Sequence, residues 1–340
     1  MKLKYLFAFV ILIGVVLTGC SAAPDGDEPQ EYDYSEFEYE PASGYPDAED
    51  SIEADSAAAG EDEPQDYEPA SVYPDAEEHA LPDYIIIGGE RFGRSLTELW
   101  LSNRNLSDED IIPLRYMTNL TQLHLLHNQI SDLTPLAGLT NLTELGLGFN
   151  QISDITPLTD LTNLTWLRLH YNRQISDITL LAELTNLKIL NLCGNQISDV
   201  MPLAGLTNLT ELHLSHNQIS DIIPLANLTN LTWLQLNSNK VSNIPPLINL
   251  TNLRALFLRD NQIVDIAPLA DIAYLTNLRL VDLGRNRIVD VAPLVDLLNY
   301  TEAYRVAFSL DGNLLIYDCT LIEDFANVYY ICVCNLWRGL

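Results

Sequence analysis

The chain has 340 residues, of which 47 are acidic and 17 are basic, so its formal net charge is −30 at pH 7. A hydrophobic content of 47% allows a large core to be buried. The sequence contains no basic patch, which argues against nucleic acid as a partner. Composition changes abruptly along the chain, so we do not expect a single compact domain.

Residues 1–19 are typical of a targeting segment. Two lysines precede a short apolar run at 6–16, and Leu-Thr-Gly-Cys follows and ends at Cys20. The run is too short to cross a membrane as a helix. The segment resembles the bacterial lipoprotein signal, whose lipobox reads Leu-small-small-Cys. That resemblance implies cleavage before Cys20, lipidation of its sulfur and an extracytoplasmic protein anchored to the bacterial cell membrane. The alternative is an ordinary secretory signal with a chance cysteine.

Residues 20–83 form a second segment of very different composition. From Ser21 to Asp83 the chain carries 22 acidic residues and neither Lys nor Arg. The ten residues that begin at Glu40 return with one change from Glu68. This composition predicts a disordered, lipid-anchored acidic linker, with a mean span of about 40–45 Å. The alternative is a tract that itself binds a basic partner or cations.

Residues 84–98 are predicted to form an N-terminal β cap. Gly88 and Gly89 separate two short stretches between Tyr84 and Phe92, a pattern typical of a hairpin. The following array of repeats needs such a cap because its end unit would otherwise expose apolar core.

A repeat with a period near 22 residues runs through residues 96–298. Each unit reads Leu-x-x-Leu-x-Leu-x-x-Asn-x-Ile, then Ser-Asp-Ile-x-Pro-Leu-x-x-Leu-Thr-Asn. The alternation Leu-x-Leu predicts a half-buried strand. Nine units align at Leu99, Leu123, Leu145, Leu167, Leu190, Leu212, Leu234, Leu256 and Val281.

Two polar columns accompany the strands. An Asn closes the turn in eight of the nine units, and its amide should satisfy backbone groups of its own and the next unit. An Asp, replaced once by Asn243, should act as N-cap of a short 3₁₀ turn that contains Pro. The first unit is atypical, because Arg104 stands where the Asn is expected.

This pattern resembles the leucine-rich repeats of the internalin family and related surface proteins of Firmicutes. The resemblance implies an α/β solenoid, a leucine-rich-repeat horseshoe of nine 22-residue repeats. It places a parallel β-sheet on the concave face and short 3₁₀ turns on the convex face. It transfers no ligand. The sequence has no sortase signal of the Leu-Pro-x-Thr-Gly type, so attachment by lipid would replace attachment by sortase.

Beyond residue 298 the period fails, and residues 299–340 are predicted to form an irregular C-terminal cap. Two apolar stretches at 306–310 and 314–317 flank Asp-Gly-Asn, which suggests a second hairpin. A disulfide from Cys319 to Cys332 or Cys334 is feasible outside the cytoplasm, and free thiols are equally compatible.

Side chains that flank the strand leucines should point to the concave face. Five of the six His and three of the four Trp occupy such positions. Large rings dominate interface energetics when a partner buries them, so they are the predicted contact residues. The alternative is that they only cover the sheet and pack on each other. The candidates are Trp100, His124, His127, Phe149, Trp166, His170, Tyr171, His213, His216, Trp233 and Phe257.

The histidines do not predict a metal site. His124 and His127 lie four repeats from His213 and His216, about 20 Å at strand spacing, so the two pairs cannot share one ion. We expect no metal and no cofactor, and expect instead that His protonation near pH 6 tunes binding.

No set of nucleophile, base and orienting group is evident, so we expect no enzymatic activity. The sequence favours a monomeric cell-surface lipoprotein whose concave face binds a protein partner, in adhesion or envelope interaction. Two alternatives remain open. The concave Trp residues could stack on sugar rings of a glycan, or the chain could be a structural surface protein without a specific ligand.

Overall fold

The computed structural model describes residues 82–271, 277–294, 307–314 and 331–332. These residues belong, from Asp83 onwards, to one compact unit. The predicted signal segment, the lipidated Cys20, the linker up to residue 81, and Cys319 and Cys334 lie outside the described residues. Among the described residues, no helix is long and apolar enough to cross a membrane.

The unit begins with the predicted hairpin. β1 (Tyr84–Ile87) pairs with β2 (Glu90–Gly93) in antiparallel register, and Gly88 and Gly89 make the turn with φ of 55° and 84°. Ile85 and Ile87 are buried against the repeat core, so the hairpin covers the first end of that core. Arg104 forms an ion pair with Glu90 and thereby ties the atypical first repeat to the cap.

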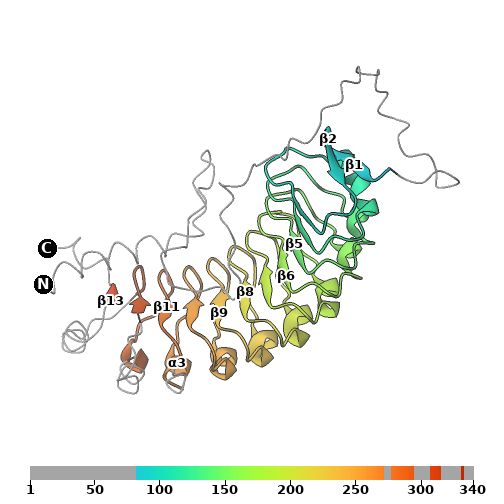
Figure 1. Ribbon diagram of the computed structural model, residues 1–340. Helices are drawn as coiled ribbons and strands as arrows, with labels where there is room; N and C mark the ends of the chain where they lie inside the picture. The colour runs from blue at the N-terminus through green and yellow to red at the C-terminus, as the bar shows by residue number, and fades with distance from the viewer. Residues whose placement is uncertain (1–81, 272–276, 295–306, 315–330, 333–340) are drawn as a thin grey trace, which may run out of the picture. The chain divides into compact units, whose positions relative to one another are not determined.

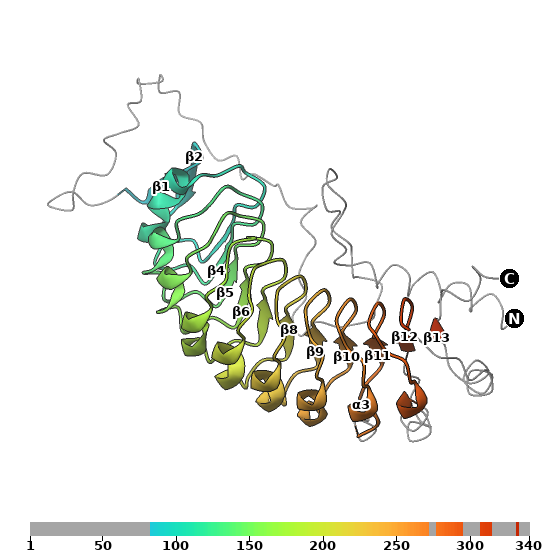
Figure 2. The same cartoon turned by 180° about the vertical axis from the view of Figure 1, so that it is seen from behind.

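A parallel sheet follows, with one short strand per repeat and neighbours in chain order. Figures 1 and 2 show these strands side by side along one side of the unit, with the helical turns along the other. The strands of the predicted repeats are β3 (Glu98–Trp100), β4 (Gln122–His124), β5 (Glu144–Gly146), β6 (Trp166–Arg168), β7 (Ile189–Asn191), β8 (Glu211–His213), β9 (Trp233–Gln235), β10 (Ala255–Phe257) and β11 (Leu280–Asp282).

The register places the aligned leucines opposite each other, for example Leu99 against Leu123 and Leu145. The side chains of all nine aligned residues are 3% exposed or less. Burial of a leucine stabilises the fold by about 1.5–3 kcal/mol. The aligned residues therefore form a continuous apolar spine that contributes strongly to stability.

The connections on the other side are mostly 3₁₀ turns, as predicted from their length. Short α-helical turns also occur, at α2 (Asp108–Ile111), at α3 (Ala267–Asp271) and at residues 292–294. The 3₁₀ turns are η1 (Ile112–Tyr116), η2 (Thr134–Leu136), η3 (Thr156–Leu158), η4 (Thr179–Glu183), η5 (Met201–Gly205), η6 (Ile223–Asn227) and η7 (Pro245–Asn249).

The aspartate column caps these turns from one position earlier than predicted. Asp132 Oδ1 accepts a hydrogen bond from Thr134 N–H at 2.8 Å, whereas Leu133 occupies the N-cap position itself. The same bond to the residue two positions on recurs at 2.8–2.9 Å in six further units. Asn243 cannot make this bond because the second residue after it is Pro245, which has no N–H.

The asparagine column links each repeat to the preceding one, not to the next as predicted. Asn150 Nδ2 donates to Leu147 O of its own repeat at 3.1 Å and to Leu125 O of the preceding repeat at 2.9 Å. Its Oδ1 accepts from Ile130 N–H at 3.0 Å. The amide therefore satisfies backbone groups of two adjacent repeats at once, because donor and acceptor sit on one planar group.

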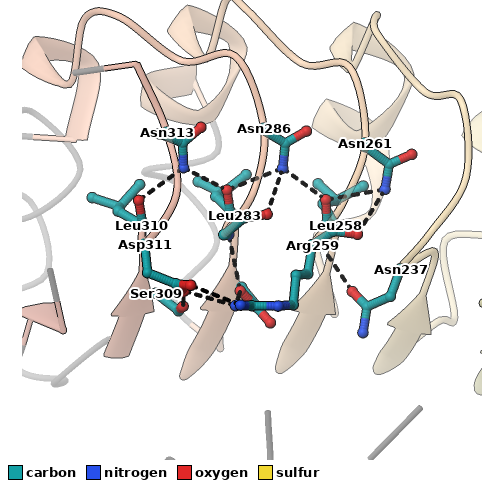
Figure 3. Close-up of polar contacts among 12 residues, drawn as sticks. Asn237, Leu258, Arg259, Asn261, Leu283, Asn286, Ser309, Leu310, Asp311 and Asn313 are labelled. Carbon is teal, nitrogen blue, oxygen red and sulfur yellow. Dashed lines mark hydrogen bonds and ion pairs between the residues drawn. The ribbon is translucent and has the colours of Figure 1, made fainter. Parts of the chain in front are cut away.

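The repeats continue beyond residue 298, which corrects the predicted boundary and the second hairpin. β12 (Ala307–Ser309) pairs in parallel with β11, and β13 (Ile331–Cys332) pairs in parallel with β12. Asn313 takes its place in the asparagine column, donating to Leu283 O and Leu310 O at 2.9 Å (Figure 3). The Asp-Gly-Asn sequence is thus the turn of a repeat, because its Asn bonds to the preceding unit.

Candidate binding surface

The outward residues of each strand form columns across the sheet. The first and third residues of a strand face away from the core, while the middle leucine points into it. After each strand, the residue immediately before the Asn of the asparagine column has a left-handed backbone conformation. Its φ lies between 52° and 67° in the eight repeats from β4 to β11, where the residues are His127, Phe149, Tyr171, Gly194, His216, Ser238, Asp260 and Arg285.

A first group of rings covers the start of the sheet. Trp100 and His124 stack in parallel, with ring centroids 3.8 Å apart and an interplanar angle of 1°. His124 also contacts Trp166, at a centroid distance of 5.3 Å. The guanidinium of Arg168 lies 4.5 Å from the Trp166 ring centroid. As a result His124 and Trp166 are only 4% and 7% exposed, whereas half of Trp100 remains exposed.

A second group, which we call the aromatic ladder, consists of His127, Phe149 and Tyr171. The rings stack across three neighbouring repeats, with centroid distances of 4.0 Å and 4.8 Å. All three residues are half-buried and have φ of 53–55°. For a residue with a side chain this conformation costs about 1–2 kcal/mol. Glycine, which avoids that cost, stands at the same position in the next repeat as Gly194.

Two glycines make room for this ladder. A Cβ on Gly148 would lie 2.2 Å from His170 Cε1, and one on Gly194 would lie 2.4 Å from Tyr171 Cδ1. The His170 ring meets Phe149 edge-on at 5.0 Å and Tyr171 at 6.0 Å. The glycines therefore allow His170 to lean over the preceding repeat and Tyr171 over the following one, which brings the rings into contact.

A third group lies further along the sheet. His213 and Trp233 have centroids 6.5 Å apart, and Trp233 and Phe257 have centroids 5.0 Å apart. Phe257 is 3% exposed. His213 Nε2 lies 3.7 Å from a carboxylate oxygen of Glu211.

The predicted candidates thus share one face but are not equally accessible. Phe257, His124 and Trp166 are covered by their neighbours, as in the alternative in which rings cover the sheet. His216 occupies the same left-handed position as the ladder, and the described residues give it no ring partner.

The surroundings of three of the histidines lower their pKa. Burial, with a contribution from Arg168, lowers the pKa of His124 to about 4 and that of His170 to about 3. Burial also lowers the pKa of His216. The expected protonation near pH 6 is therefore wrong for His124 and His170, because the rings that surround them exclude the water that would stabilise the charge.

Several polar atoms on this face are buried without a hydrogen-bond partner. Among the described residues these include His124 Nε2, His170 Nδ1, Ser215 Oγ, His216 Nε2 and Trp233 Nε1. An unsatisfied buried group costs about 1–3 kcal/mol. Such groups are uncommon in a native structure and call for a specific reason, and their concentration here sets this face apart from the flanks.

A polar cluster that the sequence did not predict closes the far end of the described face (Figure 3). Arg259 donates to both carboxylate oxygens of Asp311 at 2.7 Å, and its side chain passes across Gly284. Beneath it lies Asp282, which is fully buried and 3.7 Å from the guanidinium. The hydrogen bonds from Arg259 lower the pKa of Asp311, whereas burial raises the pKa of Asp282.

This cluster bridges β10, β11 and the turn after β12. The sequence signal was Leu310-Asp-Gly-Asn313, which matches the Leu-x-x-Asn of the other repeats. No group of three His, Cys, Asp or Glu residues within the described ranges could hold a metal ion. Cys193, the residue after Leu192 in the β7 repeat, is buried.

Comparison with known families gives a consistent result. The chain matches the family described as leucine rich repeats (2 copies) in overlapping stretches that together run from residue 94 to 296. The stretches are 94–138, 118–160, 140–183, 162–206, 185–227, 207–249, 229–271 and 251–296. The comparison with curated proteins finds no match.

Solved structures supply nearer likenesses. An internalin, InlF, from Listeria monocytogenes is 30% identical, with 67% of this chain and 78% of that one covered and a TM-score of 0.56. Internalin C2 from the same organism is 37% identical, with 60% and 83% covered and a TM-score of 0.51. The Arabidopsis receptor kinase HAESA, solved with a peptide hormone and a co-receptor, is 24% identical. The match covers 65% of this chain and 39% of HAESA with a TM-score of 0.57. At this identity the likeness shows the fold alone.

Proposed function

Because the chain belongs to the internalin-like leucine-rich-repeat proteins, we propose that its aromatic ladder is the contact site for a protein partner at the bacterial surface. The fold is one that typically binds proteins, and the identity of the partner is not encoded in it. The observation that carries the proposal is the stack of His127, Phe149 and Tyr171 in a left-handed backbone.

Strained conformations persist where the surrounding structure holds them, and they cluster at ligand-binding sites. At three consecutive repeats, a bulky residue adopts a left-handed backbone conformation that such residues disfavour. The partly exposed ring faces supply apolar area that a partner can bury. Nine strands at about 4.8 Å spacing extend over roughly 40 Å, enough for a folded protein.

The left-handed backbone makes a sharp test possible. Replacing Phe149 and Tyr171 together by Gly removes both rings and relieves backbone strain at the same positions. We expect the double variant to fold with an unchanged or higher melting temperature and to lose at least 100-fold in affinity, since two central ring contacts are each worth about 2 kcal/mol or more. Ser238→Gly is the matched control, because Ser238 has the same left-handed backbone but carries no ring.

The assay is capture of surface proteins by the purified repeat unit, followed by titration of the captured protein. Binding that survives in the double variant would place the site elsewhere. A parallel capture with enzymatically deglycosylated extracts separates protein recognition from the glycan alternative, since a glycan-dependent partner would be lost from those extracts.

We also propose that Cys20 carries the lipid anchor and that residues 20–83 hold the repeats away from the membrane. The lipobox and the acidic, low-complexity composition support this. In cell fractionation, wild type should sediment with membranes and Cys20→Ser should be released. A variant that stays in the membrane fraction would count against the anchor.

A further inference from the structure

β3 is the terminal strand at the amino-terminal end of the parallel sheet and pairs with β4 alone. Gln122 N–H donates to Thr97 O at 3.1 Å, and Leu101 N–H donates to His124 O at 2.8 Å. Successive residues of a strand direct their backbone groups to opposite sides. The N–H and C=O of Glu98 and Trp100 therefore face away from the sheet.

Those four backbone groups have no hydrogen-bond partner within the part of the chain that the structure describes. The hairpin of β1 and β2 is a separate two-stranded sheet and does not pair with β3. It covers the end of the core through Ile85 and Ile87 and leaves the strand edge open. An unpaired edge is a template for another strand, and native proteins usually protect it.

Trp100, the last residue of β3, has its ring at the same edge. His124, one strand further in, stacks on one face of the indole at 3.8 Å with parallel planes. Because this stack runs across the strands, the opposite face of the indole is directed to where a further strand would lie. Trp100 is 50% exposed, in contrast to 7% for Trp166. The open ring face and the open backbone edge thus coincide.

Charge narrows the choice of partner. Glu98 shares the outward face of β3 with Trp100 and is exposed. On an added strand, residues two positions apart would lie opposite Glu98 and Trp100. A basic residue is favoured opposite Glu98, and a planar side chain, aromatic or guanidinium, opposite the indole. The net charge of −30 on the whole chain also repels acidic partner segments.

We propose that an extended segment of a partner protein adds to the edge of β3 as a further strand. The segment carries a basic residue, one intervening residue and a planar side chain, in register with Glu98 and Trp100. Main-chain hydrogen bonds supply affinity and the two side chains supply selectivity, as in other cases of strand addition. This site is separate from the aromatic ladder and does not depend on it.

The probe for the test is a fluorescein-labelled hexapeptide, Thr-Arg-Thr-Tyr-Thr-Thr, with a second peptide in which Glu replaces Arg. Binding to the full chain is followed by fluorescence polarisation, and amide exchange is followed by NMR in the presence of unlabelled peptide. We expect the basic peptide to bind more tightly than the acidic one. The amides of Glu98 and Trp100 should exchange at least tenfold more slowly when it is bound.

Two variants locate the site. Trp100→Ala should weaken binding by roughly tenfold through loss of stacking. Glu98→Pro removes an outward donor at an edge position, where proline is tolerated, and should weaken binding while the fold remains. Ile112→Ala and Glu109→Gln, an exposed apolar and an exposed acidic residue at the same end, are the matched controls and should bind like wild type.

Three results would overturn the proposal. The first is no binding of the basic peptide at millimolar concentration. The second is binding without slower exchange at Glu98 and Trp100. The third is slow exchange at both amides that depends on protein concentration alone, which would assign the edge to a second copy of the chain. None of these affects the aromatic ladder, whose glycine variants are scored with a different ligand.

Discussion

At the scale of single residues, His170 links the ladder to pH. Its pKa is lowered to about 3 by burial, whereas an unfolded chain has the ordinary value of about 6.5. Below pH 6.5 the His170 side chain therefore binds a proton in the unfolded state but not in the folded state. The contribution of neutral His170 to the free energy of unfolding is fully present above that pH. It is lost as the pH falls through the window between about 6.5 and 3.

We predict that the unfolding free energy of wild type falls in that window with a slope steeper than that of His170→Gln. One proton per molecule corresponds to about 1.4 kcal/mol per pH unit. Urea titrations at a series of pH values give both slopes. Asp311, whose pKa is lowered by Arg259, adds the same pH dependence to both proteins at the acid end. Only the difference between the two slopes therefore reports on His170. Parallel slopes for the two proteins would refute the neutral, buried His170.

Gly148 should matter because it lies beneath the same ring. In Gly148→Ala the new Cβ would lie 2.2 Å from His170 Cε1, so the imidazole must move outwards. We predict that the pKa of His170 rises towards its ordinary range, measured by NMR titration of the ring protons. Gly138→Ala is the control, because nothing lies within 4 Å of a Cβ there. An unchanged titration curve would mean that the ring does not rest on this glycine.

The sequence predicted which residues face outwards but not which are accessible. Period-two alternation places Trp100 and Trp166 on one face and says nothing about what lies over them. Trp166 is covered because His124 and Arg168 come from the adjacent column, a contact that depends on side-chain direction. The strained backbone of Phe149 and Tyr171 was also missed, because bulky residues are not expected at positive φ.

At the scale of one element, the turn between β6 and η4 is irregular. Arg173, with φ of 62°, is an extra residue between Asn172 and the recurring Gln-Ile pair, and it lengthens this repeat to 23 residues. In the regular repeats the Asn of the next unit accepts from the backbone N–H at the Ile position, as Asn150 does from Ile130. Asn195 Oδ1 is instead buried without a partner.

Deletion of Arg173 should therefore stabilise the unit. The change restores the 22-residue period, returns the donor to Asn195 and removes one strained residue, a gain of about 1–2 kcal/mol. Chemical denaturation of the deletion variant against wild type measures it. The control is deletion of Gln151, which shortens a regular turn and should destabilise. A deletion of Arg173 that lowers stability would show that the extra residue serves the fold.

The polar cluster at the far end should fasten β12 to the preceding repeats. In Gly284→Ala the added Cβ would lie 2.3 Å from Arg259 Nη1 and 2.7 Å from Asp311 Oδ1, so the ion pair must open. We predict faster amide exchange at Leu283 and Arg285, which donate to Ser309 O and Asp311 O. Gly205→Ala is the matched control, with open space around its Cβ. Unchanged exchange would show that the ion pair does not hold this strand.

β12 escaped sequence analysis for a definable reason. Val281 and Phe308 are 27 residues apart, which breaks the period, and Asp-Gly-Asn is also typical of a hairpin turn. The partner of Arg259 is 52 residues away, so local pattern alone could not pair them. A search for Leu-x-x-Asn without a fixed period would have found Leu310 and Asn313.

At the scale of the whole unit, the repeat made the architecture predictable. Most repeats have the same leucine, Asn and Asp positions, so one short strand and one short helical turn recur and stack on their neighbours. The same regularity explains why function was harder to predict. The repeat does not fix the residue types at positions such as Phe149, Tyr171 and Gly194, and the role of the rings emerges only when they are seen in contact.

The most direct test of the central claim is site-specific photo-crosslinking of the full chain on intact bacteria. A benzophenone amino acid replaces Phe149 on the aromatic ladder and, separately, Met201, which is 59% exposed on the helical-turn side. The account predicts a discrete crosslinked protein from position 149 and none from position 201. A protein crosslinked from position 201, with no protein crosslinked from position 149, would contradict it.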